Sequence, residues 1–328
     1  MIKFLNELMN KVIGGHEIDK DEAMSILSVK NEDVPFLLGC TSAIRNRFCG
    51  NTLNFCAILN AKSGNCVNDC AYCAQSSYHR ASVKTYPLVS ADEMLNAAVQ
   101  AHQINASCFG IVTSGETVSS TAEQEIMVRS ISLIKSRYPE MDVSVSIGKI
   151  TRQFLRQLID AGLNTVHHNL ETSARHYANI CTTRSFNEKL DFLNLLKDEK
   201  VKVCCGGILG LGETLEDQVD MAFTLRSLRV NRVPLNFLNP IPGTKLENMK
   251  QKTPLENLRS IALFRFALPE KHIQVCGGRE LNFRSLQPAI FWAGADGMMV
   301  GNYLTTAGQD PKADLQIIND LNMTVVSN

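Results

Sequence analysis

Apolar positions follow two alternating patterns from about residue 50 to the end of the chain. Short runs of β-branched and apolar residues predict buried strands, and the stretches between them repeat their apolar residues at helical spacing. The predicted strands are Leu53–Leu59, Ala106–Thr113, Val143–Ile147, Thr165–Asn169, Val201–Gly207, Val233–Leu238, Ile273–Val275 and Met298–Val300. The predicted helices begin with one at Ser90 and continue near Glu123–Arg137, Thr151–Ala161, Glu188–Glu199, Leu215–Arg226, Pro254–Leu268 and Gln287–Ala293.

Eight strands alternating with helices predict an α/β fold, a closed (β/α)8 barrel of the TIM type, with an open doubly wound sheet as the alternative. Residues 1–50 are predicted to form an N-terminal helical extension, because Leu5, Leu8, Met9 and Val12 lie at helical spacing. The barrel is expected over residues 51–328. With no internal linker, we predict one domain overall, with its active site at the C-terminal ends of the strands.

The charge balance and the cysteine content narrow the class of protein. Lys+Arg and Asp+Glu number 33 each, which favours neither nucleic acid nor an anionic membrane as a partner. No apolar run approaches the length that spans a bilayer, and the first residues lack an apolar signal core. We therefore expect a cytoplasmic protein. Eleven cysteines in such a protein favour metal or catalytic roles over disulfides.

Three of these cysteines, Cys66, Cys70 and Cys73, have the spacing Cys-x3-Cys-x2-Cys directly after the first predicted strand. A 4Fe–4S cluster held by three thiolates leaves one iron free. A partial zinc site is the alternative, but no second cysteine pair follows at the spacing zinc sites use. Together with Tyr72, the triplet resembles the signature of the radical S-adenosylmethionine (SAM) superfamily. That resemblance implies that SAM binds the open iron and is cleaved to methionine and a 5′-deoxyadenosyl radical.

Further motifs resemble the biotin synthases, and the similarity covers residues 30–310. The matching runs are Asn60–Cys66, Cys73-Ala-Gln-Ser-Ser, His168–Ser173, Thr182-Thr-Arg184, Gly206–Glu213, Pro234–Thr244 and Gly277-Gly-Arg279-Glu280. This family closes the thiophane ring of biotin by inserting sulfur between two carbons of dethiobiotin. The resemblance implies dethiobiotin as substrate, an electron donor such as flavodoxin or ferredoxin, and a homodimer.

The resemblance also implies roles for individual polar residues. Asn169 and Glu171 are two positions apart at the end of a strand, so they face the same side. By resemblance they contact the SAM ribose and the ureido group of dethiobiotin, and Asn236 makes the second ureido contact. An amide suits a neutral urea because both groups donate and accept hydrogen bonds. Lys189 stands where the family often has an arginine near the SAM carboxylate.

A glycine-rich run follows the fifth predicted strand and ends in an acid. Gly206, Gly207, Gly210 and Gly212 lack side chains and would let the backbone approach a ligand closely. Glu213 is then a hydrogen-bond acceptor or a helix N-terminal charge. We expect Gly207, Gly210 and Glu213 to contact the SAM cofactor, with an ordinary turn as the alternative.

One departure from the family concerns a second cluster. Familiar biotin synthases hold a 2Fe–2S cluster with three cysteines and one arginine, and one of its sulfides becomes the sulfur of biotin. By resemblance these ligands align with Gly110, Ser144, Cys204 and Arg279. Two thiolates are therefore absent at the aligned positions. Arg279 is retained as a predicted residue of the substrate site.

Other cysteines are candidates for the missing ligands. Our hypothesis is an auxiliary four-iron cluster, as in a variant of the family associated with obligate anaerobes. The predicted ligands are Cys49, Cys56, Cys204 and Cys205. Cys108 and Cys276 are reserves. Neighbouring residues of a strand point to opposite faces, which counts against using both vicinal cysteines unless a bulge intervenes. The alternative is that these thiols are small buried hydrophobic residues.

The sequence thus predicts a radical SAM enzyme that converts dethiobiotin to biotin. Cys66, Cys70 and Cys73 would hold the catalytic cluster, and the auxiliary iron–sulfur cluster would supply sulfur. An enzyme of the same barrel family with another substrate, like the hydrogenase maturase or methylornithine synthase, is one alternative, supported by Gly110 and Ser144. A non-catalytic iron–sulfur carrier is a second.

Overall fold

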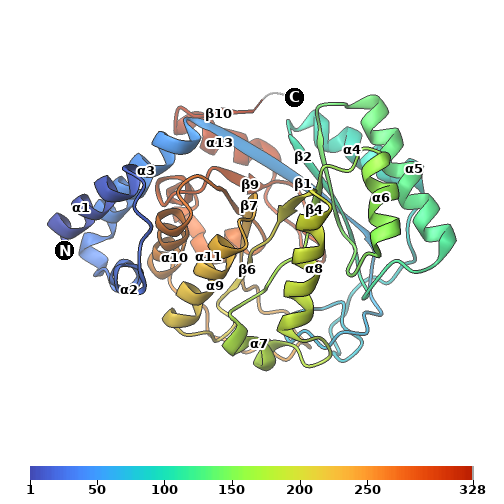
Figure 1. The fold of residues 1–328 in the computed structure, drawn as a ribbon, viewed down its shortest axis with the longest axis horizontal. Coiled ribbons are helices and arrows are strands. Elements are labelled where there is room, and N and C mark those ends of the chain that lie inside the picture. Colours follow the sequence, from blue (N-terminus) through green and yellow to red (C-terminus); the bar gives the residue numbers. More distant parts are fainter. Residues whose placement is uncertain (327–328) are drawn as a thin grey trace.

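The computed structural model describes residues 1–326 and contains a closed barrel of parallel strands (Figure 1). The strands are β1 (Thr52–Lys62), β2 (Cys108–Thr113), β3 (Asp142–Ser146), β4 (Thr165–His167), β5 (Lys202–Cys204), β6 (Gly207–Leu209), β7 (Arg232–Phe237), β8 (His272–Val275), β9 (Gly297–Met299) and β10 (Thr324–Val325). The order is β1-β2-β3-β4-β5-β7-β8-β9, and β9 pairs with β1 to close it. The predicted TIM-type barrel is therefore confirmed.

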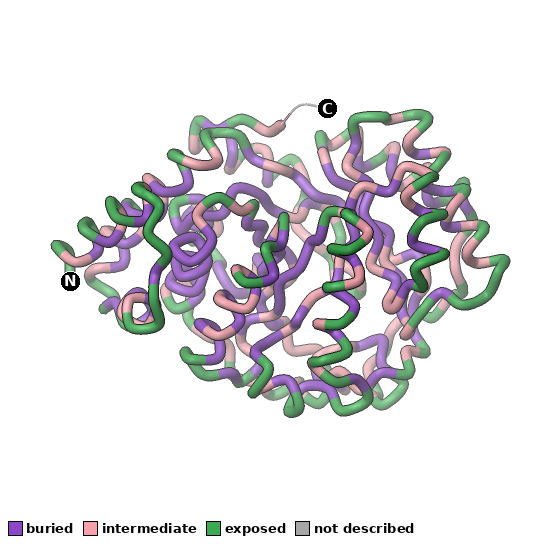
Figure 2. The backbone as a smooth tube through the Cα atoms, viewed as in Figure 1, coloured by how far each residue is buried: buried purple, intermediate pink, exposed green. Residues whose placement is uncertain are grey.

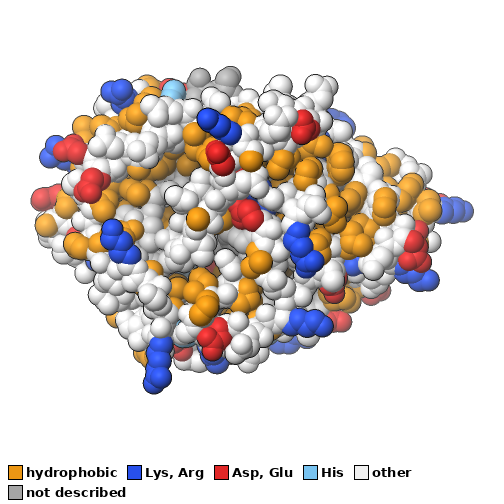
Figure 3. Space-filling view, turned by 180° about the vertical axis from the view of Figure 1, so that it is seen from behind, with side chains coloured by type: hydrophobic (Ala, Val, Ile, Leu, Met, Phe, Trp, Pro, Cys, Tyr) orange, Lys and Arg blue, Asp and Glu red, His pale blue; other side chains and the backbone are white. Residues whose placement is uncertain are grey.

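Helices surround the barrel and follow most of its strands. They are α1 (Ile2–Ile13), α2 (Lys20–Leu27), α3 (Val34–Cys49), α4 (Ala91–Gln103), α5 (Thr121–Arg137), α6 (Arg152–Asp160), α7 (Ala174–Ile180), α8 (Phe186–Asp198), α9 (Leu215–Ser227), α10 (Pro254–Ala267), α11 (Arg279–Phe283), α12 (Ala289–Trp292) and α13 (Pro311–Asp320), with 3₁₀ turns η1 (Asn31–Asp33) and η2 (Arg284–Leu286). None of the described helices is long and apolar enough to cross a membrane. Lys and Arg are interspersed with Asp and Glu on the face seen in Figure 3.

Capping boxes define where several outer helices begin. The Ser90 hydroxyl accepts a hydrogen bond from the Glu93 amide, and the Glu93 carboxylate accepts one from the Ser90 amide at 2.9 Å. The same reciprocal pair starts α8, α9 and α10. Each cap stabilises its helix by about 1 kcal/mol. They therefore set where each of these helices starts.

The N-terminal helices share the hydrophobic core of the barrel. Leu5, Leu8 and Val12 of α1 are buried, and Met9 packs against the same core. Helix α3 contacts α1 and α10, while α2 contacts α9 and α10. Figure 2 shows the buried backbone continuing from these helices into the barrel strands. The predicted apolar face of α1 is confirmed, and it packs on the barrel side of the molecule.

The fifth predicted strand, Val201–Gly207, is divided into β5 and β6. A Cβ atom on Gly206 would lie 2.0 Å from the Pro234 carbonyl oxygen, and one on Gly207 would lie 2.4 Å from that of Glu171. Neighbouring backbones therefore approach closely here, and only glycine fits. Both glycines serve contacts between strands.

Candidate active site

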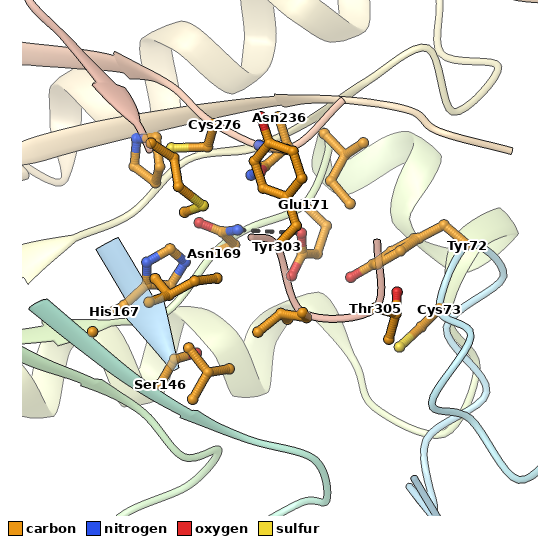
Figure 4. A pocket seen from close by; sticks show the side chains of 18 of the residues that line it. Tyr72, Cys73, Ser146, His167, Asn169, Glu171, Asn236, Cys276, Tyr303 and Thr305 are labelled. Atoms are coloured by element: carbon orange, nitrogen blue, oxygen red, sulfur yellow. Dashed lines mark hydrogen bonds between the residues drawn. The ribbon is translucent and has the colours of Figure 1, made fainter. Parts of the chain in front are cut away.

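The barrel encloses a cavity of about 390 Å³ lined by residues from most of its strands. Figure 4 shows Tyr72, Cys73 and Thr305 on one side of it and His167 and Cys276 on the other. Asn169, Glu171 and Tyr303 lie between these groups. The cavity therefore has two chemically distinct ends, joined by a polar middle.

The cysteine triplet lies in the loop that follows β1. Backbone turns shape this loop, since the Cys73 amide donates to the Cys70 carbonyl at 2.9 Å and the Cys66 amide donates to the Gln75 carbonyl at 2.9 Å. Cys66, Tyr72 and Cys73 line the cavity. The three thiols are partly buried and form no disulfide. The loop thus presents free thiols at the cavity edge, where the sequence places the open cluster.

The donors of this loop are three thiols, the ligand type that holds iron–sulfur clusters. Among residues 1–326, no three His, Cys, Asp or Glu side chains converge closely enough to chelate one metal ion. A 4Fe–4S cube needs wider spacing, because each thiolate binds a different iron. Burial raises the pKa of Cys73 to about 11, so its thiol stays protonated until a metal displaces the proton.

Asn169 and Glu171 face the cavity from the end of β4, as predicted. The Asn169 side-chain oxygen accepts from the Gly206 amide at 3.0 Å, and its amide nitrogen lies 3.5 Å from the Glu171 carboxylate. Lys189 Nζ donates to the Asn169 carbonyl at 2.9 Å and lies 3.8 Å from Glu171. Lys189 lines the cavity, but its ammonium already has partners in the wall.

Arg184 is a cationic cavity residue that the sequence analysis did not single out. Its side chain is 9% exposed and lines the cavity. Its Nε and Nη2 atoms have no hydrogen-bond partner among the described residues. A buried guanidinium with free donors is costly unless an anion binds it. The signal for it in the sequence is the run Thr182-Thr-Arg184, which resembles the family.

The middle of the cavity presents neutral polar groups. Asn236 donates to the Gly207 carbonyl at 3.3 Å and accepts from the Gly277 amide at 3.0 Å, which holds its amide against the wall. Burial lowers the pKa of His167 to about 4, so its imidazole is neutral near pH 7. Asn169, Asn236 and His167 therefore offer donors and acceptors without charge.

Four thiols line the inner end of the cavity, and they come from four strand regions. They are Cys56 of β1, Cys108 of β2, Cys204 of β5 and Cys276 after β8. Cys56 and Cys108 are register partners, and their Sγ atoms are 3.0 Å apart. Burial, followed by the nearby Cys108, raises the pKa of Cys276 to about 12. The four side chains converge on one buried site.

This arrangement corrects the predicted auxiliary set. Cys205 packs in the hydrophobic core outside the cavity, because it points opposite to Cys204 on the strand. Cys49 ends α3 near Arg265 and does not line the cavity. The structure does not bring these two thiols together with Cys56 and Cys204. The reserves Cys108 and Cys276 take their places.

The positions aligned with the missing ligands do lie beside this site. Gly110 and Ser144 are register partners that line the cavity. Cys108 precedes Gly110 by two residues and so faces the same side of β2. A thiol therefore lies on the same face of β2 as Gly110, two residues away.

Four predicted contact residues lie outside the cavity lining. Arg279 is buried, but its guanidinium donates to Asp314 at 2.8 Å and to Gln287, which is a correction to its predicted place in the substrate site. Glu213 accepts from the Gly210 amide at 2.9 Å and from Lys252 at 2.6 Å. Gly207, Gly210 and Glu213 therefore shape the loop beneath the site.

A C-terminal segment also closes the cavity, and sequence reasoning missed it. Tyr303, Leu304, Thr305 and Thr306 follow β9 and line the cavity, and Figure 4 shows Thr305 beside Cys73 of the cysteine loop. The Tyr303 hydroxyl donates to Glu280 at 2.9 Å, and Asn60 donates to the Leu304 carbonyl at 2.9 Å. The segment has no periodic pattern, so only its position after the last strand could have marked it.

Comparisons with known proteins agree with this geometry. Residues 61–225 match the radical SAM superfamily, and residues 234–324 match the biotin and thiamin synthesis associated domain. The chain is 45% identical to biotin synthase of Geobacter sulfurreducens over 99% of this chain and 98% of that protein.

Solved structures of lower identity share the fold. Methylornithine synthase has a TM-score of 0.85 at 18% identity, over 97% of each chain. The [FeFe]-hydrogenase maturase HydG of Carboxydothermus hydrogenoformans has a TM-score of 0.81 at 15% identity, over 98% of this chain and 79% of that one. At such low identities, these two structures support only the barrel fold. With the sequence match above, the chain belongs to the biotin synthase family of radical SAM enzymes.

Proposed function

We propose that this chain converts dethiobiotin to biotin by radical SAM sulfur insertion. The observation that carries the proposal is one cavity with Cys66 and Cys73 at its mouth, in the loop that also carries Cys70, and four further thiols at its inner end. Neutral amides lie between them. When bound, the cluster and SAM supply the radical that abstracts hydrogen from the substrate, and the auxiliary cluster supplies sulfur.

The residues near the cysteine loop form the proposed SAM site. Glu171 and Asn169 line the middle of the cavity and offer hydrogen-bond partners to a ribose or an amine. Arg184 offers its free donors to the carboxylate of SAM. Lys189 supports the SAM site indirectly. Its hydrogen bond to the Asn169 carbonyl holds the end of β4 in place.

The substrate lies between the two ends in this proposal. Asn169 and Asn236 bind the ureido group, and the neutral His167 adds a third polar contact from the same face of β4. A charged residue there would pay a desolvation cost without a charged partner in the urea. The enclosed barrel keeps water and other C–H bonds away from the radical.

The proposed auxiliary cluster is a four-iron cluster held by Cys56, Cys108, Cys204 and Cys276. Four converging thiols supply one ligand for each iron. The electron donor, such as flavodoxin or ferredoxin, the homodimer and the cytoplasmic location belong to this proposal through family membership. The two alternative substrates are not favoured, because their representatives share only 18% and 15% identity with this chain. A pure iron–sulfur carrier would have no use for the cavity between the clusters.

The proposed reaction predicts a direct product. Anaerobically reconstituted protein, given dethiobiotin, SAM and reductant, is expected to form biotin, detected by mass spectrometry. If the auxiliary cluster is rebuilt with ³⁴S-sulfide, the biotin should carry the heavy sulfur. Unlabelled biotin would contradict the sulfur source, and formation of 5′-deoxyadenosine without biotin would contradict the substrate.

The role of Arg184 gives a second prediction. Arg184→Leu is expected to weaken SAM binding roughly 10–100-fold, because a hydrogen bond to a charged group is worth about 1.5–3 kcal/mol. Equilibrium dialysis of SAM against cluster-loaded protein measures this. Arg129→Leu, which removes a side chain that is 67% exposed, should bind SAM normally. Unchanged affinity in Arg184→Leu would assign the carboxylate to another group.

A further inference from the structure

A half-buried arginine on a neighbouring strand contacts one of the four inner thiols. Arg232 begins β7 and pairs in register with Cys204 of β5. Its Nη1 atom donates to Cys108 Sγ at 3.1 Å. Its side chain is 15% exposed and lines the cavity. No part of the proposed reaction above has used this residue.

The second half of the guanidinium is held by a carboxylate. Arg232 Nη2 donates to Asp142 Oδ2 at 3.3 Å, and the Thr165 hydroxyl donates to Asp142 Oδ1 at 2.9 Å. Asp142 begins β3 and is the register partner of Cys108 on β2. The guanidinium is therefore oriented, with one edge toward Asp142 and the other toward Cys108.

The negative charge of a cluster bound to the four inner thiols explains why Arg232 lies beside them. A 4Fe–4S core with four thiolate ligands carries a net negative charge, and burying it without a counter-ion is costly. The Arg232 guanidinium contacts Cys108 directly and lies on the strand next to Cys204, so its charge is close to the proposed ligands. The group is a permanent cation with five donors and no acceptor.

We propose that Arg232 is a positioning residue of the auxiliary cluster, which orients the Cys108 thiolate and compensates the negative charge of the cluster. This inference rests on the ligand set proposed above. A charged guanidinium has no lone pair to offer iron, and its other edge is bound to Asp142, so it acts as a donor beside the ligands. A positive charge at this distance favours the reduced cluster, which carries one more electron.

The inference predicts opposite shifts of the midpoint potential in two variants. Arg232→Met should lower the potential of the auxiliary cluster, because a positive charge is lost. Asp142→Asn should raise it, because a negative charge is lost. Arg232→Lys should fall between Arg232→Met and the unmodified protein, since it keeps the charge but loses the fork. Lys202→Met, at the exposed start of β5, removes a cation without touching the thiols and should leave the potential unchanged.

The measurement is an EPR-monitored redox titration of the full chain, with iron per chain determined for each variant. Roughly eight irons should be retained throughout. Retained iron with an unmoved potential in both Arg232→Met and Asp142→Asn would overturn the inference alone. Loss of about four irons in both arginine variants would overturn it by making Arg232 a ligand. About four irons in the unmodified protein would overturn the ligand set and this inference together.

Discussion

Cys66→Ala is expected to abolish cleavage of SAM. The triplet supplies the only thiolates proposed for the open cluster, and two ligands do not hold a cube stably. Because second-shell changes at metal sites already cost roughly 10–100-fold, loss of a ligand should lower 5′-deoxyadenosine formation by more than about 100-fold. Chromatography of 5′-deoxyadenosine after incubation with SAM and dithionite measures the loss, and iron should fall from roughly eight to roughly four per chain.

The control for this variant is another cysteine. Cys40 is buried in α3, far along the chain from the cysteine loop, and Cys40→Ala removes a thiol without touching the cavity. It should keep its iron and its 5′-deoxyadenosine formation. Normal SAM cleavage by Cys66→Ala would contradict the assignment of the triplet. Equal loss in both variants would point to a general effect on folding.

Cys108→Ala is expected to separate the two halves of the reaction. This variant loses a proposed ligand of the auxiliary cluster, so biotin should fall below detection and iron should fall to roughly four per chain. The cysteine loop is intact, and so reductive formation of 5′-deoxyadenosine from SAM should persist. Mass spectrometry for biotin and chromatography for 5′-deoxyadenosine, run on the same samples, test both statements.

Two matched variants distinguish the revised ligand set from the one predicted by sequence. Cys205→Ala and Cys49→Ala remove thiols that do not line the cavity, and both should retain roughly eight irons and form biotin. Iron loss in these variants, with full iron in Cys108→Ala, would restore the set drawn from sequence.

Periodicity predicted the barrel because its signal is local. Each strand is a short apolar run, and the capping box at Ser90 marks a helix start that the structure places there. The errors in the predicted strand bounds occur where contacts with other strands, and not the local sequence, decide the structure. β1 continues to Lys62, beyond the predicted Leu59, and one predicted strand is split at Gly206 by contact with Pro234. Strand extent here depends on neighbouring strands, which a single run does not describe.

The functional residues also divide into those that a local sequence pattern marks and those that only the tertiary structure reveals. The triplet lies within one short segment, so its pattern is visible in the sequence. Asn169 and Glu171 both line the cavity, as their two-residue spacing on a strand predicted. Arg184 and the segment after β9 carry no pattern of their own. They were found because the tertiary structure leaves one with free donors and places the other over the cavity.

The sequence alone determined the family, the barrel and the position of the cysteine triplet, since all three depend on patterns within short segments. Only the tertiary structure decided which of the remaining cysteines belong together. Barrel closure and register bring Cys56 beside Cys108 and Arg232 beside Cys204, and they turn Cys205 away. These relations join strands separated by 28 to 52 positions along the chain, and no local pattern encodes them.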